Sequence, residues 1–363
     1  MTLFTCIVFG SWLLCVHKVN DIKIFKHKKR AEVMQTHHIS LLTGDAKLNA
    51  DYYVGVLGMR FIKNSVNQAN PRNRHVYYGD FMGTPGTVIT FFPIDDLRDR
   101  TDGKMFFSGI HYSIPEGSTQ YWLDRFAEKG LKAEVDAMGR IRTADFEDLP
   151  IRMQETEGKN FDWHINYMSD VPAEFQITGV IGAELHVPDV AATGRFFEEL
   201  LEIPVKGNII DLDGVEAIEL VQTAEDAPNS RFGKGSTDHY ALGVESEEDL
   251  KYYWERAKAL GFKREVFIDR GYFRSAYFIE PGGNRIELAT TNPGFTLDES
   301  LFDLGTTFAL PPRFEASRQE LLDHYAKKGV FFDEVKPYTG TGHLENGGKI
   351  RAIHDENGNT RND

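Results

Sequence analysis

The chain is poor in cysteine. Of its 363 residues only Cys6 and Cys15 are cysteines, and both lie within the first 30 residues. A disulfide framework and a cysteine-based zinc site are therefore excluded from the rest of the chain, because each needs several cysteines. Such sparse use of cysteine is typical of proteins in a reducing compartment, so we expect a cytoplasmic location.

The N-terminal apolar segment is too short for an ordinary membrane span. It runs from Leu3 to Val16, whereas a helix that crosses a bilayer needs roughly 20 residues. No basic stretch precedes it, as one would in a signal peptide. A weak membrane anchor is one interpretation of this segment. We favour another, in which residues 1–34 are an extension outside the fold, Met34 is the functional start and no stable membrane association forms.

Positive charge is also in deficit. The chain has 41 Lys and Arg against 55 Asp and Glu, a formal net charge of -14. Nucleic acids and anionic membranes would be repelled by such a surface, so we expect a small-molecule substrate and no nucleic-acid partner. The 41% of hydrophobic residues can fill the cores of two domains. A homo-oligomer is left open.

The chain does contain an internal repeat. One unit, a strand followed by a helix and further strands, occurs four times after residue 36. Its four copies, modules 1 to 4, open with "HHISLLTG", "FFSGIHYSIP", "TGVIGAELHVPD" and "TDHYALGVES". The helix of module 1 should bury Leu48, Tyr52 and Val56 on one face and stop at Gly58. Asp189 and Ser246 are expected to cap the helices of modules 3 and 4.

The repeat predicts an α+β fold of four βαβββ modules paired into two domains. Periodicity alone would also allow a ferredoxin-like fold. We expect modules 1 and 2 (residues 35–158) to form the first domain, and modules 3 and 4 (residues 175–292) the second. Residues 293–363 are expected to form a C-terminal helix and a polar tail that is disordered from about Thr339.

Superposing modules 1 and 4 reveals candidate metal ligands. "DHYALGVE" laid over "HHISLLTG" places His239 over His38, and "PGGNRIELA" laid over "TPGTVITFF" places Glu287 over Thr90. Two imidazoles and one carboxylate can occupy one face of an octahedral ferrous ion. Three coordination positions then stay open for a substrate and dioxygen. A glyoxalase-type isomerase usually needs a further carboxylate, and Thr90 stands where it is expected.

Alternative interpretations remain open at this point. A lone histidine on a strand is more often structural, but modules 2 and 3 carry Gly109 and Gly182 in the ligand register. A competing site could use residues that are out of register with one another, namely His111, His186 and Glu219. A metal-dependent isomerase or thiol transferase, and a metal-free binding protein, are the alternative functions.

Four segments carry a family resemblance. "HHISLLTGDAKLNADYYVGVLGMRFIK", "RHVYYGDFMGTPGTVITFFP", "RGYFRSAYFIEPGGNRIELAT" and "ALPPRFEASRQELL" resemble the hydroquinone-type ring-cleaving dioxygenases of the vicinal oxygen chelate, or glyoxalase/bleomycin resistance, superfamily. The similarity spans roughly residues 35 to 326. It implies a cupped, barrel-like mixed sheet and cleavage of a hydroquinone or related diol with O2.

The resemblance also implies roles for particular residues. Fe(II), with Mn(II) as a substitute, would be held by His38, His239 and Glu287. His37, Arg270 and Tyr277 would act on the substrate: His37 would move a proton, Arg270 would neutralise developing charge and Tyr277 would hydrogen-bond the reacting oxygen.

The sequence indicates alternatives for three neighbouring residues. By strand alternation His37 should point away from His38, and a solvent-exposed imidazole is the alternative. His75 either lines the cavity or is structural. Asp238 departs from the family pattern, in which a histidine often precedes the module 4 ligand.

Overall fold

The computed structural model describes residues 34–157 and 164–332, together with the backbone of three strands nearer the N-terminus. Residues 1–34 and residues 35–363 form two compact units. In the first unit, β1 (Thr5–Phe9), β2 (Trp12–Val16) and β3 (Ile22–Lys26) pair antiparallel in that order. The polar tail expected from Thr339 lies outside the described residues.

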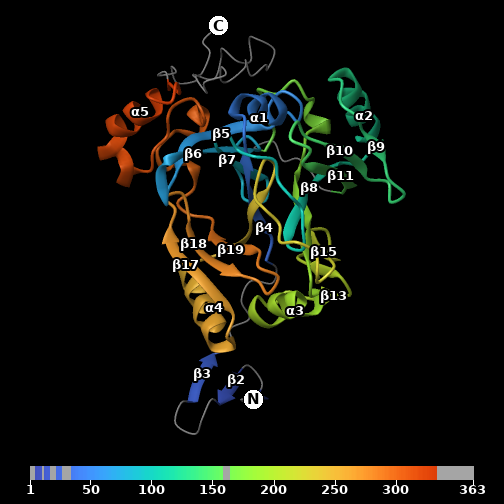
Figure 1. Ribbon diagram of the computed structural model, residues 1–363, viewed down its shortest axis with the longest axis vertical. Helices are drawn as coiled ribbons and strands as arrows, with labels where there is room; N and C mark the ends of the chain where they lie inside the picture. Colours follow the sequence, from blue (N-terminus) through green and yellow to red (C-terminus); the bar gives the residue numbers. More distant parts are fainter. Residues whose placement is uncertain (1–4, 10–11, 17–21, 27–33, 158–163, 333–363) are drawn as a thin grey trace. The chain divides into compact units, whose positions relative to one another are not determined.

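The second unit is built on two mixed eight-stranded sheets (Figure 1). Sheet I has the order β17-β18-β19-β16-β4-β7-β6-β5 and sheet II the order β13-β14-β15-β12-β8-β11-β10-β9. The strands of sheet I are β4 (Thr36–Thr43), β5 (Arg60–Asn67), β6 (Asn70–Gly79), β7 (Val88–Pro93), β16 (Thr237–Val244), β17 (Lys263–Asp269), β18 (Arg274–Ile279) and β19 (Arg285–Thr290). Those of sheet II are β8 (Phe106–Pro115), β9 (Glu134–Val135), β10 (Ile141–Ala144), β11 (Pro150–Thr156), β12 (Gly179–Val187), β13 (Val205–Lys206), β14 (Ile209–Asp211) and β15 (Ala217–Gln222). The α+β fold of four strand-rich modules is therefore confirmed.

The modules do not pair in chain order. Sheet I joins modules 1 and 4 through β4 and β16, which run antiparallel, and sheet II joins modules 2 and 3 through β8 and β12. Within each module the first strand pairs with the last in parallel, so its other edge is open for a partner module. The expected grouping of residues 35–158 and 175–292 thus does not correspond to the two sheets.

Within the described residues, five α-helices and several single turns lie between the strands or after the last strand. The helices are α1 (Ala46–Tyr53), α2 (Thr119–Glu128), α3 (Val190–Arg195), α4 (Glu247–Leu260) and α5 (Arg318–Ala326). A π-helical turn at Phe196–Leu200 continues α3, and 3-10 turns lie at Ala173–Phe175, Phe295–Leu297, Leu301–Asp303 and Pro312–Ser317. Figure 1 shows α4 beside β17 and β18, which it contacts.

Helix ends follow local signals in the sequence. The side chains of Asp189 and Ser246 accept hydrogen bonds from the first turns of α3 and α4, as expected. Gly58 has a φ of 71°, a conformation that glycine adopts readily. However, α1 ends at Tyr53, before Val56, and its buried face is not the expected one: Tyr52 is buried, whereas Leu48 is 47% exposed.

The two sheets pack through their central strands. β4 lies against β12, and β16 lies against β8. Between them the rings of Tyr240 and Phe107 stack with centroids 5.7 Å apart. The C-terminal segment packs on one edge of sheet I, where Leu321 and Tyr325 of α5 and Val66 of β5 belong to one buried cluster. Among the described residues, no helix is both long and apolar enough to cross a membrane.

Candidate metal centre

His38, His239 and Glu287 converge inside sheet I. They lie on three adjacent strands, β4, β16 and β19, and all three are at least 96% buried. The Nε2 atoms of the two histidines are 3.2 Å apart. Glu287 Oε2 lies 2.8 Å from His239 Nε2 and 3.5 Å from His38 Nε2. Within the described part of the chain, no other group of His, Cys, Asp and Glu has the geometry to hold a metal ion.

This geometry fits a divalent metal ion. Neither contact of Glu287 Oε2 has the geometry of a hydrogen bond, so this buried oxygen has no hydrogen-bond partner. A buried carboxylate oxygen without a partner is costly unless a cation compensates it. Two nitrogen ligands at right angles, each about 2.1 Å from a metal, would be about 3 Å apart. The observed separation of the two Nε2 atoms matches that value.

Burial and neighbouring charges shift the pKa of all three side chains. Burial lowers the pKa of His38, which favours the neutral imidazole that a metal needs. Burial alone would also lower the pKa of His239, but the Glu287 and Asp238 carboxylates raise it above its ordinary value. Burial disfavours the Glu287 anion, yet His239 and His38 hold the pKa of Glu287 well below its ordinary range.

His37 contacts His38, contrary to the orientation expected from strand alternation. Ala241 of β16 lies opposite His38 and the next residue lies opposite Thr36, so His37 is an extra, bulged residue in β4. Bulges change the direction of a side chain. His37 Nδ1 lies 2.8 Å from His38 Nδ1, and His37 Nε2 lies 3.2 Å from the carbonyl oxygen of Thr290. The ring is buried rather than exposed, and burial lowers its pKa to about 3.

Asp238 has the corresponding position beside the second ligand. Its Oδ2 atom lies 2.6 Å from His239 Nδ1 and 2.8 Å from an Nη of Arg285. Arg285 in turn donates two hydrogen bonds to Glu265. Burial opposes the Asp238 anion, but His239 and Arg285 lower its pKa to about 2.

A cavity of about 300 Å³ opens beside the candidate ligands. His38, His239, Arg270 and Tyr277 line it, so two of the three expected substrate residues border the same space as two ligands. Arg270 Nε donates a hydrogen bond of 3.1 Å to the Tyr277 hydroxyl. Burial, with the nearby Glu287 carboxylate, raises the pKa of Tyr277 well above its ordinary value, so its hydroxyl stays protonated. His37 does not line the cavity.

The other residues that line the cavity include both apolar and polar side chains. Leu42, Phe92 and Phe273 supply apolar surface. His75 also lines the cavity, with its Nε2 atom 2.7 Å from Thr90 Oγ1 and its ring stacked on Phe92. His75 is therefore both hydrogen-bonded within the fold and placed at the cavity.

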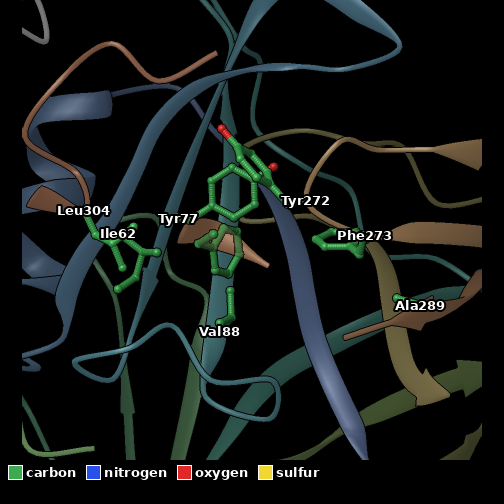
Figure 2. Packing of buried hydrophobic residues seen from close by; sticks show 8 residues of the cluster. Ile62, Tyr77, Val88, Tyr272, Phe273, Ala289 and Leu304 are labelled. Atoms are coloured by element: carbon green, nitrogen blue, oxygen red, sulfur yellow. The ribbon is translucent and has the colours of Figure 1, made fainter. Parts of the chain in front are cut away.

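A buried aromatic cluster packs against the rings of His37 and His38. Phe273 lies edge-on to His37, with ring centroids 5.1 Å apart, and tilted against His38 at 5.3 Å. Figure 2 shows the cluster to which it belongs, with Tyr77 and Tyr272 at the centre and Phe273 toward Ala289. This packing limits the freedom of both imidazole rings.

Sheet II contains a salt-bridge network around the residues of the competing site. Arg152 lies opposite His111 and pairs with Glu184, while Arg140 lies 2.9 Å from Glu219. His186 contacts Glu184 at 2.9 Å. Arginines therefore already neutralise the negative charge around the competing site of His111, His186 and Glu219.

Sequence reasoning missed two residues of the centre. Arg285 supports Asp238, and Ser275 donates a hydrogen bond to Glu287. Each lies two residues before a recognised site residue, Glu287 and Tyr277 respectively. Because alternate residues of a strand share a face, the spacing of two could have identified both.

Comparisons with known proteins identify the family of this chain. Residues 179–288 match the family model described as Glyoxalase/Bleomycin resistance protein/Dioxygenase superfamily. The chain is 35% identical over 308 residues to "Putative ring-cleaving dioxygenase MhqA" of Bacillus subtilis, which covers 78% of this chain and 96% of the relative. It is 27% identical to a "Chlorohydroquinone/hydroquinone 1,2-dioxygenase" of Sphingobium indicum, over 79% of this chain and 94% of that protein.

A solved structure gives the same result for the fold. The crystal structure of a "putative dioxygenase" from Bacillus subtilis superposes with a TM-score of 0.72 at 28% identity, over 80% of this chain and 96% of that one. Together with a relative that is 35% identical over most of both chains, this likeness shows the family. The chain belongs to the ring-cleaving dioxygenases of the glyoxalase/bleomycin resistance protein/dioxygenase superfamily, and it is an oxygenase enzyme.

Proposed function

We propose that the protein is an Fe(II)-dependent dioxygenase that opens the aromatic ring of a hydroquinone or related diol with O2. In this proposal His38, His239 and Glu287 hold the metal. The observation that carries it is the convergence of their three donor atoms, one of them a buried carboxylate oxygen without a hydrogen-bond partner. The relative named for chlorohydroquinone and hydroquinone supports the substrate class.

A ferrous ion in this site would supply open positions for a substrate oxygen and O2, together with a route for electrons from the ring to O2. Mn(II) accepts similar ligands and is the alternative metal. A glyoxalase-type isomerase is less well supported, because the hydroxyl of Thr90, at the position of a further carboxylate, contacts both Ser40 and His75 at 2.7 Å.

Arg270 and Tyr277 act on the substrate in this proposal. The Arg270 guanidinium borders the cavity and would compensate the negative charge of a deprotonated diol. Tyr277 keeps its proton and would donate a hydrogen bond to the reacting oxygen. The aromatic ring of the substrate would lie against Phe92 and Phe273, which exclude water from that side of the cavity.

We propose that His37 acts through His38 rather than directly on the substrate. It contacts His38 and not the cavity, so it would act on the reaction through the ligand. We also propose a cytoplasmic location, which the sparse use of cysteine supports.

Oxygen uptake tests the proposed function. The protein is purified without oxygen, loaded with Fe(II) and mixed with hydroquinone, substituted hydroquinones or catechol in an oxygen electrode. We expect about one O2 consumed per ring opened and a yellow ring-opened acid. His111→Ala is the control variant and should behave like the wild type. Turnover of methylglyoxal and a thiol under argon, without diol activity in air, would contradict the proposal.

A further inference from the structure

The geometry points to a pair of positioning residues, His37 and Asp238, that each fix the tautomer of the histidine that follows, so that both imidazoles present an unprotonated Nε2 to one metal ion. This inference rests on the proposed metal centre but not on the proposed substrate. Asp238 would thereby orient His239, the ligand that follows it in the chain.

The hydrogen bonds of His37 form a directed relay. The carbonyl oxygen of Thr290 can only accept, so His37 Nε2, 3.2 Å away, must carry the ring hydrogen. A neutral imidazole has a single N–H, which leaves a lone pair on His37 Nδ1. His38 Nδ1, 2.8 Å away, must then donate its hydrogen to that lone pair. The remaining nitrogen of His38, Nε2, is therefore unprotonated and faces His239 and Glu287.

Asp238 produces the same outcome at the second ligand. Its carboxylate can only accept, so His239 Nδ1, 2.6 Å away, carries a hydrogen and Nε2 is the nitrogen that remains for a metal. The same oxygen of Asp238 accepts from Arg285, which Glu265 holds from the other side. These contacts orient the carboxylate toward His239.

The two positioning residues differ in charge. His38 donates to an uncharged imidazole and His239 donates to an anion, although each partner immediately precedes its ligand in the chain. A carboxylate on the outer nitrogen makes an imidazole a stronger metal ligand. His239 should therefore be the stronger donor of the two, and Asp238 should contribute more than orientation.

Metal binding in the absence of any diol tests the inference. Co(II) affinity of the full chain is measured by competition with a chelating dye, and folding is checked by circular dichroism. His37→Leu and Asp238→Leu should bind Co(II) about 10- to 100-fold more weakly than the wild type, as is typical when such partners are lost. His37→Gln should restore most of the affinity, because its amide can both accept from His38 and donate to Thr290. The matched control His111→Leu removes a buried histidine of sheet II and should bind like the wild type.

The outcomes separate this inference from the proposed function. Wild-type affinity in both folded leucine variants would overturn the inference. If either variant fails to fold, ¹⁵N-histidine NMR of the wild type loaded with Zn(II) decides: we expect His37 protonated at Nε2, and protonation of His37 at Nδ1 would overturn the relay. A wild type that binds neither Co(II) nor Zn(II) would remove the metal centre itself. Tight metal binding without diol activity would refute only the proposed substrate chemistry.

Discussion

His38 and Glu287 are cross-strand neighbours of one and the same residue, Ala241 of β16. Side chains directly opposite each other in a sheet share a face. The two proposed ligands therefore flank a methyl group, and that small side chain leaves room for their side-chain N and O atoms to approach within 3.5 Å.

Enlarging Ala241 should consequently abolish metal binding without unfolding the protein. Ala241→Leu would place a bulky side chain between the ligands, with an overpacking cost of about 1–3 kcal/mol. Iron content after anaerobic loading and the free energy of unfolding in urea are the measurements. Ala183→Leu, at a fully buried alanine of β12 in sheet II, should show a similar stability cost and bind iron normally. Full iron content in Ala241→Leu would contradict this account of the site.

Removing any one ligand should have the same effect on the metal. His38→Ala, His239→Ala and Glu287→Ala should each lose most of their iron while staying folded, because a site of three protein ligands has none to spare. His111→Ala should keep its iron, since His111 lies in the salt-bridge network of sheet II. Metal analysis of the purified variants checks both expectations, and unchanged iron in the three ligand variants would refute the assignment.

Tyr277→Phe should separate catalysis from metal binding. The Tyr277 hydroxyl accepts a hydrogen bond from Arg270 and borders the cavity. Because it is not one of the three proposed ligands, its loss should leave iron content unchanged. The rate of ring cleavage should fall by about two orders of magnitude, the effect of one hydrogen bond of roughly 3 kcal/mol in the transition state. Tyr240→Phe removes a buried hydroxyl that contacts Thr36 and serves as the control for rate. Equal rates in Tyr277→Phe and the wild type would assign Tyr277 a structural role.

Glu216 should make stability depend on pH. It accepts a hydrogen bond from the backbone N–H of Thr36, and burial raises its pKa from 4.5 to about 7. Because the folded protein favours the protonated carboxyl, its contribution to stability is present below about pH 4.5 and is lost as the pH rises to about 7.

The variant Glu216→Gln removes this dependence but keeps an oxygen for Thr36. Its melting temperature should exceed that of the wild type at pH 8 and approach it near pH 4.5. A difference that grows toward low pH would show that the sign is wrong.

Lys63 should be essential for stability. Its fully buried ammonium contacts Asp298 at 2.5 Å and Glu299 at 2.6 Å, and so fixes the segment after β19 onto β5. Lys63→Met would leave two buried carboxylates uncompensated, at a cost of about 3–5 kcal/mol in the free energy of unfolding. Lys206→Met breaks an exposed ion pair with Asp211 and should cost far less, because water already screens that pair. Urea unfolding of both variants gives the comparison, and equal costs would refute the buried-pair argument.

Much of the architecture could be predicted because it is encoded locally. The repeat placed the strands and helices, and superposing its copies brought His239 onto His38 and Glu287 onto Thr90. The structure has the same correspondence, since Glu287 lies opposite Ala241 as Thr90 lies opposite Ser40. Such register arguments succeed because alternate residues of a strand share a face.

The pairing of modules and the environment of the ligands depended on tertiary structure. Every module exposes the same kind of open strand edge, so the sequence does not say which edge meets which, and modules 1 and 4 pair across 200 residues of chain. The bulge that turns His37 onto His38 arises only when β4 pairs with β16, because it is a mismatch between two strands and not a property of one. The sequence by itself thus determined which residues could bind a metal. The packing of distant strands decided how His37 and Asp238 contact these residues and how Arg285 contacts Asp238.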